Sequence, residues 1–150
     1  MEQLILSQTN FNKLREEVKK NNNRELIFSS NDDELNRKVL EKLPIQILLI
    51  NLNNRKDFQK QRNSGFNQVM AKITKKKDIT IGINLDEIIE SKSKEKAEIL
   101  ARLKQNIFLC NKNKIKMKFI SQNKKNERNP YDLKSLGLIL GMPTWMVKKV

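Results

Sequence analysis

Short apolar runs alternate with amphipathic stretches along this chain. The runs are rich in Ile, Leu and Phe, which predicts strands at 4–6, 26–28, 45–52, 79–83 and 115–119. Between them, apolar residues recur at three- and four-residue spacing, which predicts helices. This alternation indicates an α/β fold in which parallel (β/α) repeats form one sheet. A complete eight-fold barrel takes about 250 residues, so we expect a partial, TIM-barrel-like sheet of about five strands.

Polar residues mark the expected helix ends. Asn10 is the predicted N-cap of the first helix, and either Ser30 or Asn31 is the predicted N-cap of the second. Pro130 is expected at the first position of a late helix, because its missing N–H costs nothing there. Gly141 is expected to end that helix.

One segment after the third strand has no periodicity. Residues 53–64 are polar and basic, which predicts a long loop. The helix that follows is expected to turn four side chains inward, namely Phe66, Val69, Met70 and Ile73. The longest helix is predicted at 94–111, with Ala97, Leu100, Leu103 and Ile107 at helical spacing. No linker or repeat divides the sequence, so residues 1–150 are predicted to form a single domain.

The charge balance points to a polyanionic partner. Lys and Arg total 31 and Asp and Glu total 17, which gives a formal net charge of +14. Such an excess of positive charge attracts RNA or DNA. In the free protein, the positively charged side chains repel one another. An AT-rich genome would explain part of the abundance of Lys, Asn and Ile, but not the excess of Lys over the acids.

Several kinds of active site are excluded by composition. The chain has no histidine, so it cannot carry a Ser-His-Asp or Cys-His nucleophile or a His-ligated zinc. A carboxylate-only magnesium site stays possible in principle, although the acids are scattered. Cys110 is the one cysteine, which favours a reducing compartment. With no membrane-length apolar run and no basic leader, we expect a cytoplasmic protein.

Polar side chains follow each predicted strand. In parallel α/β folds, sites gather at the carboxyl ends of the strands. Hydroxyls, amides and guanidiniums there suit phosphate and ribose contacts, although Ser7, Asn10, Ser30 and Asn31 could equally be helix caps. Arg55 and Arg128 are not needed as caps. Aromatic residues make up only 5% of the chain, so backbone recognition of a folded RNA is expected as the main mode, rather than base stacking.

Two sequence blocks resemble one protein family. Residues 54–57 and 65–73, continued by 76–83, are similar to ribonuclease P protein component 3, the larger α/β protein subunit that archaea share with eukaryotes. Residues 128–133, with Leu136-Gly137 and Gly141-Met142, form the second block. A weaker third block comprises residues 30–32 with Arg37.

The resemblance implies a fold and a function. The family fold resembles a TIM barrel related to PHP phosphoesterases, and its members are non-catalytic subunits of an enzyme whose catalyst is RNA. That enzyme removes 5′ leaders from precursor tRNA. Expected partners are the RNase P RNA, precursor tRNA, a small ferredoxin-like RNase P protein and other RNase P proteins, with no membrane. This chain is expected to bind no cofactor, and Mg²⁺ is expected to serve the RNA.

The family pattern also assigns roles to residues. The basic positions that it implies as RNA-binding, together with their basic neighbours, are Arg37, Arg55, Lys56, Lys72, Lys76, Lys77 and Arg128. Asn31, Pro130 and Gly141 are expected to be structural. Asp132 is expected to orient Arg128 or to cap its helix.

The chain departs from the family in two places. It is short, and its first strand matches an interior family strand, so one or two N-terminal βα units of the family have no counterpart. Residues 121–125 form a basic segment where the family has a turn of small residues. Two other functions remain open: a generic basic RNA-binding module, and a metal-dependent phosphoesterase using Asp86 and Asp132. The absence of histidine disfavours the phosphoesterase.

Overall fold

A single parallel sheet organises the chain in the computed structural model, which describes residues 2–150. The strand order is β1-β2-β3-β4-β5, and every neighbouring pair is parallel. The strands are β1 (Gln3–Leu6), β2 (Glu25–Ser30), β3 (Ile47–Ile50), β4 (Thr80–Asn84) and β5 (Met117–Ile120). The predicted parallel sheet of five strands is therefore confirmed.

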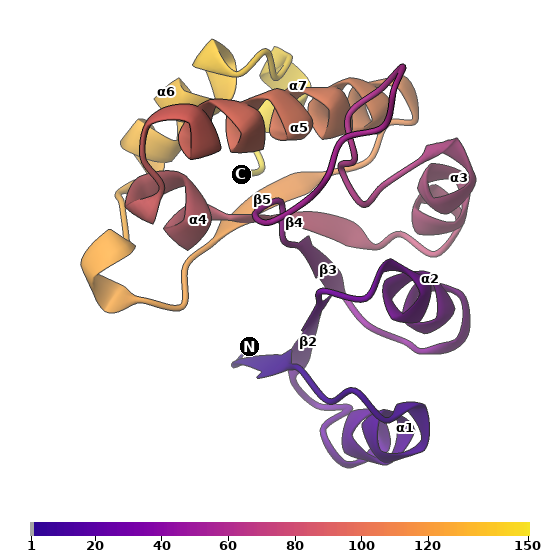
Figure 1. Ribbon diagram of the computed structural model, residues 1–150. Helices are drawn as coiled ribbons and strands as arrows, with labels where there is room; N and C mark the ends of the chain where they lie inside the picture. Colours follow the sequence, from indigo (N-terminus) through magenta and orange to yellow (C-terminus); the bar gives the residue numbers. More distant parts are fainter. Residues whose placement is uncertain (1) are drawn as a thin grey trace.

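Helices connect the strands and lie around the outside of the curved sheet (Figure 1). They are α1 (Phe11–Lys20), α2 (Asp33–Lys42), α3 (Gln68–Lys76), α4 (Leu85–Glu90), α5 (Ser93–Lys112), α6 (Pro130–Ile139) and α7 (Thr144–Val147), with a 3₁₀ turn η1 (Lys124–Asn126). No helix among residues 2–150 is long and apolar enough to cross a lipid bilayer.

Helix caps are supplied by the polar residues that follow the strands. Asn10 caps α1 by accepting hydrogen bonds from the backbone N–H groups of residues 12 and 13. Asp32, and not Ser30 or Asn31, caps α2: its side chain accepts hydrogen bonds from the backbone N–H groups of Glu34 and Leu35. Ser30 still belongs to β2, and its hydroxyl accepts a hydrogen bond from Asp32 N. Pro130 is the first residue of α6, and Gly141 follows that helix at φ +100°, a conformation that favours glycine.

Both faces of the sheet are apolar. The outer face packs against the helices in the main core, where Phe28, Leu48 and Ile81 are almost completely buried. The inner face holds a second cluster of Ile27, Ile47, Leu49 and Ile120, with Ile5 beside it. Residues of β2 and β5 belong to this one cluster, so the curved sheet buries its own inner face, as a partial barrel does.

Three predictions about the central elements need correction. The third strand is shorter than the predicted 45–52, although Ile45 and Leu52 are buried on either side of it. Helix α3 begins at Gln68, so Phe66 is buried from the loop instead of from the helix. Val69 was predicted to face inward but is 51% exposed, because the helix phase is set by Met70 and Ala71.

Candidate functional site

The connection between β3 and α3 is the longest irregular segment of the structure. It runs over residues 51–67 and leaves the sheet at the carboxyl end of the central strand. Irregular segments of this length are usually functional or disordered. Here polar side chains from α2, α4 and α5 form hydrogen bonds with both halves of the loop, and the Arg102 side chain among them is buried.

Arg102 of α5 fixes the first half of the loop. Its side chain is only 4% exposed. Nε donates to Asp57 Oδ1 at 3.0 Å, Nη1 to the Leu52 carbonyl at 3.0 Å and Nη2 to the Arg55 carbonyl at 2.8 Å. A buried guanidinium costs free energy unless its donors are satisfied, and these three partners all belong to the loop.

The same face of α5 fixes the second half. The Gln105 amide donates to the Arg62 carbonyl at 2.9 Å, and its oxygen accepts from Arg62 N at 3.3 Å. Asn106 Nδ2 donates to the Ser64 carbonyl at 3.0 Å. Positions 102, 105 and 106 are three and four residues apart and therefore lie on one helix face. One face of α5 thus serves as the template for the loop.

Arg55 anchors the loop to the start of α2. Its guanidinium forms two hydrogen bonds with Asp33, at 2.8 and 3.0 Å, and also donates to the Asn51 carbonyl and to Asn63 Oδ1. The side chain is 8% exposed. The structure therefore gives Arg55 a positioning role, in place of the exposed phosphate contact expected from the sequence.

A glycine makes this Arg55 geometry possible. Gly65 has φ +70°, and a Cβ at that position would lie 2.6 Å from Arg55 Nη2. The absence of a side chain lets the guanidinium pack directly on the loop backbone.

Two carboxylates on the loop and next to it have opposite electrostatic surroundings. The hydrogen bond from Arg102 holds the pKa of Asp57 below its ordinary value, supported by the Asn63 N–H. Burial raises the pKa of Glu87, although its carboxylate accepts hydrogen bonds from Leu52 N at 2.9 Å and Asn53 N at 3.2 Å. Both carboxylates thus accept hydrogen bonds from backbone N–H groups of the loop, and Asp57 also binds Arg62 and Arg102.

A row of amides crosses the sheet beside the loop. Asn84 of β4 donates to Asn51 Oδ1 at 2.9 Å, and Asn51 donates to Asn31 Oδ1 at 3.2 Å. These residues line a polar cavity of about 520 Å³ together with Arg55 and Lys56. Amides and a lysine in an open polar cavity suit ribose and phosphate oxygens. The carboxyl ends of β2, β3 and β4 thus meet through these three amides.

The remaining predicted RNA-binding residues are separated in space. Lys56 is exposed on the loop, and Arg37 is exposed on α2, where it pairs with Glu41 at 3.0 Å. Lys72 and Lys76 are exposed on α3. This helix leads into the start of β4, so it ends near the amino ends of the strands, whereas the loop begins at their carboxyl ends. Arg128 is exposed before α6, and its Nη1 donates to the carbonyls of Lys125 and Glu127.

Lys77 is exposed but also makes a structural contact. Its Nζ donates to the carbonyls of Leu40 at 2.7 Å and Leu43 at 3.2 Å, at the end of α2. Partial burial lowers the pKa of this lysine. Lys77 therefore satisfies the C-terminal carbonyls of a neighbouring helix.

Two acids singled out from the sequence also have structural surroundings. Asn129, and not Asp132, caps α6 by accepting from Asp132 N, so the predicted capping role of Asp132 is wrong. Burial would raise the pKa of Asp86, but hydrogen bonds from Asn126, Gln122, Ser121 and Asn123 hold it below its ordinary value. Among residues 2–150, no group of three acids or cysteines is placed to hold a metal ion.

The residues that sequence reasoning missed are those of the α5 face. The predicted inward stripe included Ala97, which is exposed, whereas Arg102 and Asn106 are buried between Ile99 and Cys110. A signal was present in the sequence: Arg102 and Asn106 are spaced three or four residues from the apolar residues that face the core. Buried polar groups usually have partners; Arg102 and Asn106 Nδ2 find theirs in the loop, whereas Asn106 Oδ1 has none.

Fold and site together define a basic, partial (β/α) barrel that presents a rigid loop. The family model described as RNase P subunit p30 matches residues 3–150. The chain belongs to the RNase P subunit p30 family.

Individual relatives agree with this assignment. The chain is 33% identical over 110 residues to ribonuclease P protein component 3 of Methanococcus vannielii, covering 72% of this chain and 45% of that protein. A chain in the cryo-EM structure of archaeal ribonuclease P with mature tRNA shares the fold, with a TM-score of 0.78 and 22% identity. That match covers 98% of this chain and 62% of the other. The present chain thus spans about half the length of the curated relative.

Replacing Arg102 tests whether the loop depends on α5. Arg102→Met should lower the free energy of unfolding by about 3 kcal/mol or more, because two loop carbonyls lose their donor and Asp57 loses one of its three. Chemical denaturation measures the change, and Lys104→Gln on the exposed side of α5 is the matched control, expected within about 0.5 kcal/mol of the parent. Equal effects of the two substitutions would contradict the assigned role.

Acid titration tests the Asp57–Arg102 pair. A carboxylate with a lowered folded pKa stabilises the fold above its unfolded pKa, near 3.8, and this contribution is lost as the pH falls through the folded value. We therefore expect the stability difference between the parent and Asp57→Asn to shrink below pH 3.8. Unfolding free energies measured on both sides of that pH give the result, and a constant difference would refute the pair.

Substituting Lys77 separates a structural lysine from a surface one. Lys77→Met should lower the free energy of unfolding by about 1 kcal/mol, because two carbonyls at the end of α2 lose their donor. Its exposed neighbour offers the comparison: Lys76→Met should change stability by less than about 0.5 kcal/mol. Thermal and chemical denaturation of both variants would decide.

Proposed function

We propose that this chain is a non-catalytic, RNA-binding subunit of ribonuclease P, which supports the catalytic RNA in removing 5′ leaders from precursor tRNA. Membership of the RNase P subunit p30 family supports the proposal, as does the net charge of +14. The observation that carries it is the β3–α3 loop. It is basic, exposed at its tip and anchored by hydrogen bonds from the buried Arg102 and between Arg55 and Asp33.

Rigidity matters for binding because ordering a loop costs conformational entropy. A loop that is fixed in the free protein does not lose this entropy when it binds. Lys56 and Lys60 are exposed on this loop, and Arg62 keeps part of its guanidinium free while pairing with Asp57 at 3.0 Å. These cations are placed for contacts with phosphates, which fix register and supply affinity.

The chemistry in this proposal belongs to the RNA. Asp86 accepts four hydrogen bonds from the segment after β5. Within the described residues it does not belong to any group of three acids or cysteines that could hold a metal ion. Such a carboxylate positions backbone and is a poor candidate for a phosphoesterase site. The proposal assigns no cofactor to this chain and leaves Mg²⁺ to the RNA.

The partners proposed follow from the family. They are the RNase P RNA, precursor tRNA, a small ferredoxin-like RNase P protein and other RNase P proteins. The proposal also places the protein in the cytoplasm, in line with its single cysteine. Burial of Cys110 raises the pKa of its thiol, which keeps it unreactive.

Reconstitution tests the function directly. The protein alone should leave precursor tRNA intact, and it should raise the cleavage rate when added to the cognate RNase P RNA with the other protein subunits. Cleavage by the protein alone would overturn the non-catalytic assignment. Equal affinity for the RNase P RNA and for an unrelated RNA duplex would favour a generic RNA-binding module.

Salt titration tests the exposed basic residues. Lys56→Gln and Arg128→Gln should each weaken RNA binding and reduce the slope of log K against log salt by about 1, because each removes one phosphate contact. Lys77→Met removes the same charge at a structural position and should leave the slope unchanged. If the Lys56 and Arg128 variants both keep the salt slope of the parent protein, these two residues do not belong to the interface.

A further inference from the structure

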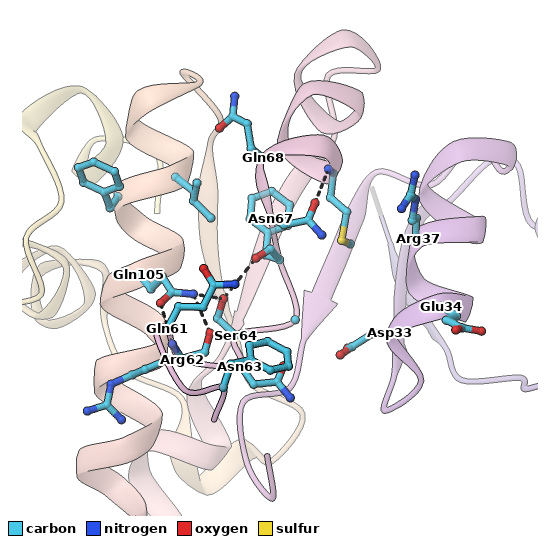
Figure 2. Close-up of a pocket in the computed structure, with 16 residues that line it drawn as sticks. Asp33, Glu34, Arg37, Gln61, Arg62, Asn63, Ser64, Asn67, Gln68 and Gln105 are labelled. Carbon is cyan, nitrogen blue, oxygen red and sulfur yellow. Dashed lines mark hydrogen bonds between the residues drawn. The ribbon is translucent and has the colours of Figure 1, made fainter. Parts of the chain in front are cut away.

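Two exposed phenylalanines line the same groove although they are far apart in the sequence. Phe58 lies on the β3–α3 loop and is 58% exposed, and Phe108 lies on α5 and is 69% exposed. The groove has a volume of about 550 Å³. Figure 2 shows its walls, with Arg37 on α2, Gln105 on α5 and Gln61 on the loop. Large exposed apolar side chains gathered in one concavity indicate a binding surface.

Each phenylalanine is flanked in the sequence by two lysines. Lys56 and Lys60 are two residues before and after Phe58 on the loop. Lys104 and Lys112 lie one helical turn before and after Phe108, so all three share one face of α5. All four lysines are exposed. An aromatic ring between cations can stack on a base while the cations bind the adjoining phosphates.

The polar lining of the groove includes unused donors. The Gln61 side chain forms no hydrogen bond within residues 2–150, and the Nδ2 groups of Asn63 and Asn67 donate none there. Other amides in the wall are fixed, since Gln105 binds the loop and Gln68 exchanges hydrogen bonds with Asn113. Free amides beside a stacking surface can pair with the edge of a base.

We propose that this groove binds unpaired nucleotides of RNA, with one base stacked on Phe58, another on Phe108, and the neighbouring phosphates held by the flanking lysines. The inference rests on the proposed RNA-binding function and adds a recognition mode to it. Charge favours a nucleic acid as the occupant, because these four exposed lysines, together with Arg37 and Arg62 in the groove wall, outnumber the nearby acids Asp33, Glu34 and Asp57. A duplex would keep its bases stacked and would leave the rings unused.

Binding of two RNA probes to the purified full chain tests the proposal. The probes are a fluorescein-labelled oligouridylate and a labelled RNA duplex of the same length, compared by fluorescence anisotropy. Phe58→Ala and Phe108→Ala should each weaken binding of the oligouridylate by roughly 5-fold to 100-fold, the range expected for one stacked base. Duplex affinity should not change, and neither should the salt slope for either probe, because no cation is removed.

The control is an exposed aromatic residue elsewhere. Tyr131 on α6 is 81% exposed and lies outside the groove, so Tyr131→Ala should leave both affinities unchanged. Phe58→Leu and Phe108→Leu keep an apolar side chain without a ring and should also lose oligouridylate binding. Fluorescence of Trp145, the only tryptophan, reports whether each variant is folded.

Each contrary outcome has a distinct meaning. If the Phe58→Ala/Phe108→Ala double variant binds oligouridylate as tightly as the parent, or loses both probes equally while folded, the stacking proposal is overturned. If it keeps RNA binding but no longer stimulates the reconstituted enzyme, the groove binds protein, which also overturns the proposal. If the parent binds neither probe nor the RNase P RNA, the proposed function itself fails.

Discussion

The buried guanidinium of Arg102 is the interaction on which the functional surface depends. It lies at the centre of α5 and donates to Asp57 and to two carbonyls of the loop. Without these partners a buried charge would destabilise the fold, so helix and loop have to form together. The loop then carries Lys56 and Phe58 in defined positions. One buried face of α5 therefore shapes the loop, while the opposite, exposed face carries Phe108.

Positive charge has two separate uses in this molecule. Arg55 and Arg102 are buried and shape the loop, and Lys77 satisfies the end of α2. Lys56 and Arg128 remain exposed and are available to a partner. The net charge of +14 predicts attraction to a polyanion, but only exposed cations can contact one directly. Counting basic residues thus overstates the number available for such contacts.

Sequence reasoning predicted local features and missed those set by tertiary contact. The order of strands and helices, the long loop and the meeting of Asn31, Asn51 and Asn84 all follow from periodicity and from parallel topology. The role of Arg55 did not, because its exposure depends on Asp33, which lies 22 residues away. The groove was missed for the same reason. A low aromatic content argued against stacking, yet folding places Phe58 and Phe108 along one groove.

The partial barrel does not weaken this site. The sheet has two unpaired edges, β1 and β5, which face each other across grooves that Gln3 shares with Lys118 and Ile5 shares with Gln122. The loop leaves from β3, which is hydrogen-bonded to β2 on one side and β4 on the other. Its supports come from α2, α4 and α5, which follow β2 and β4. The recognition surface is thus built on the central strands, and its geometry is independent of whether the edges are ever joined.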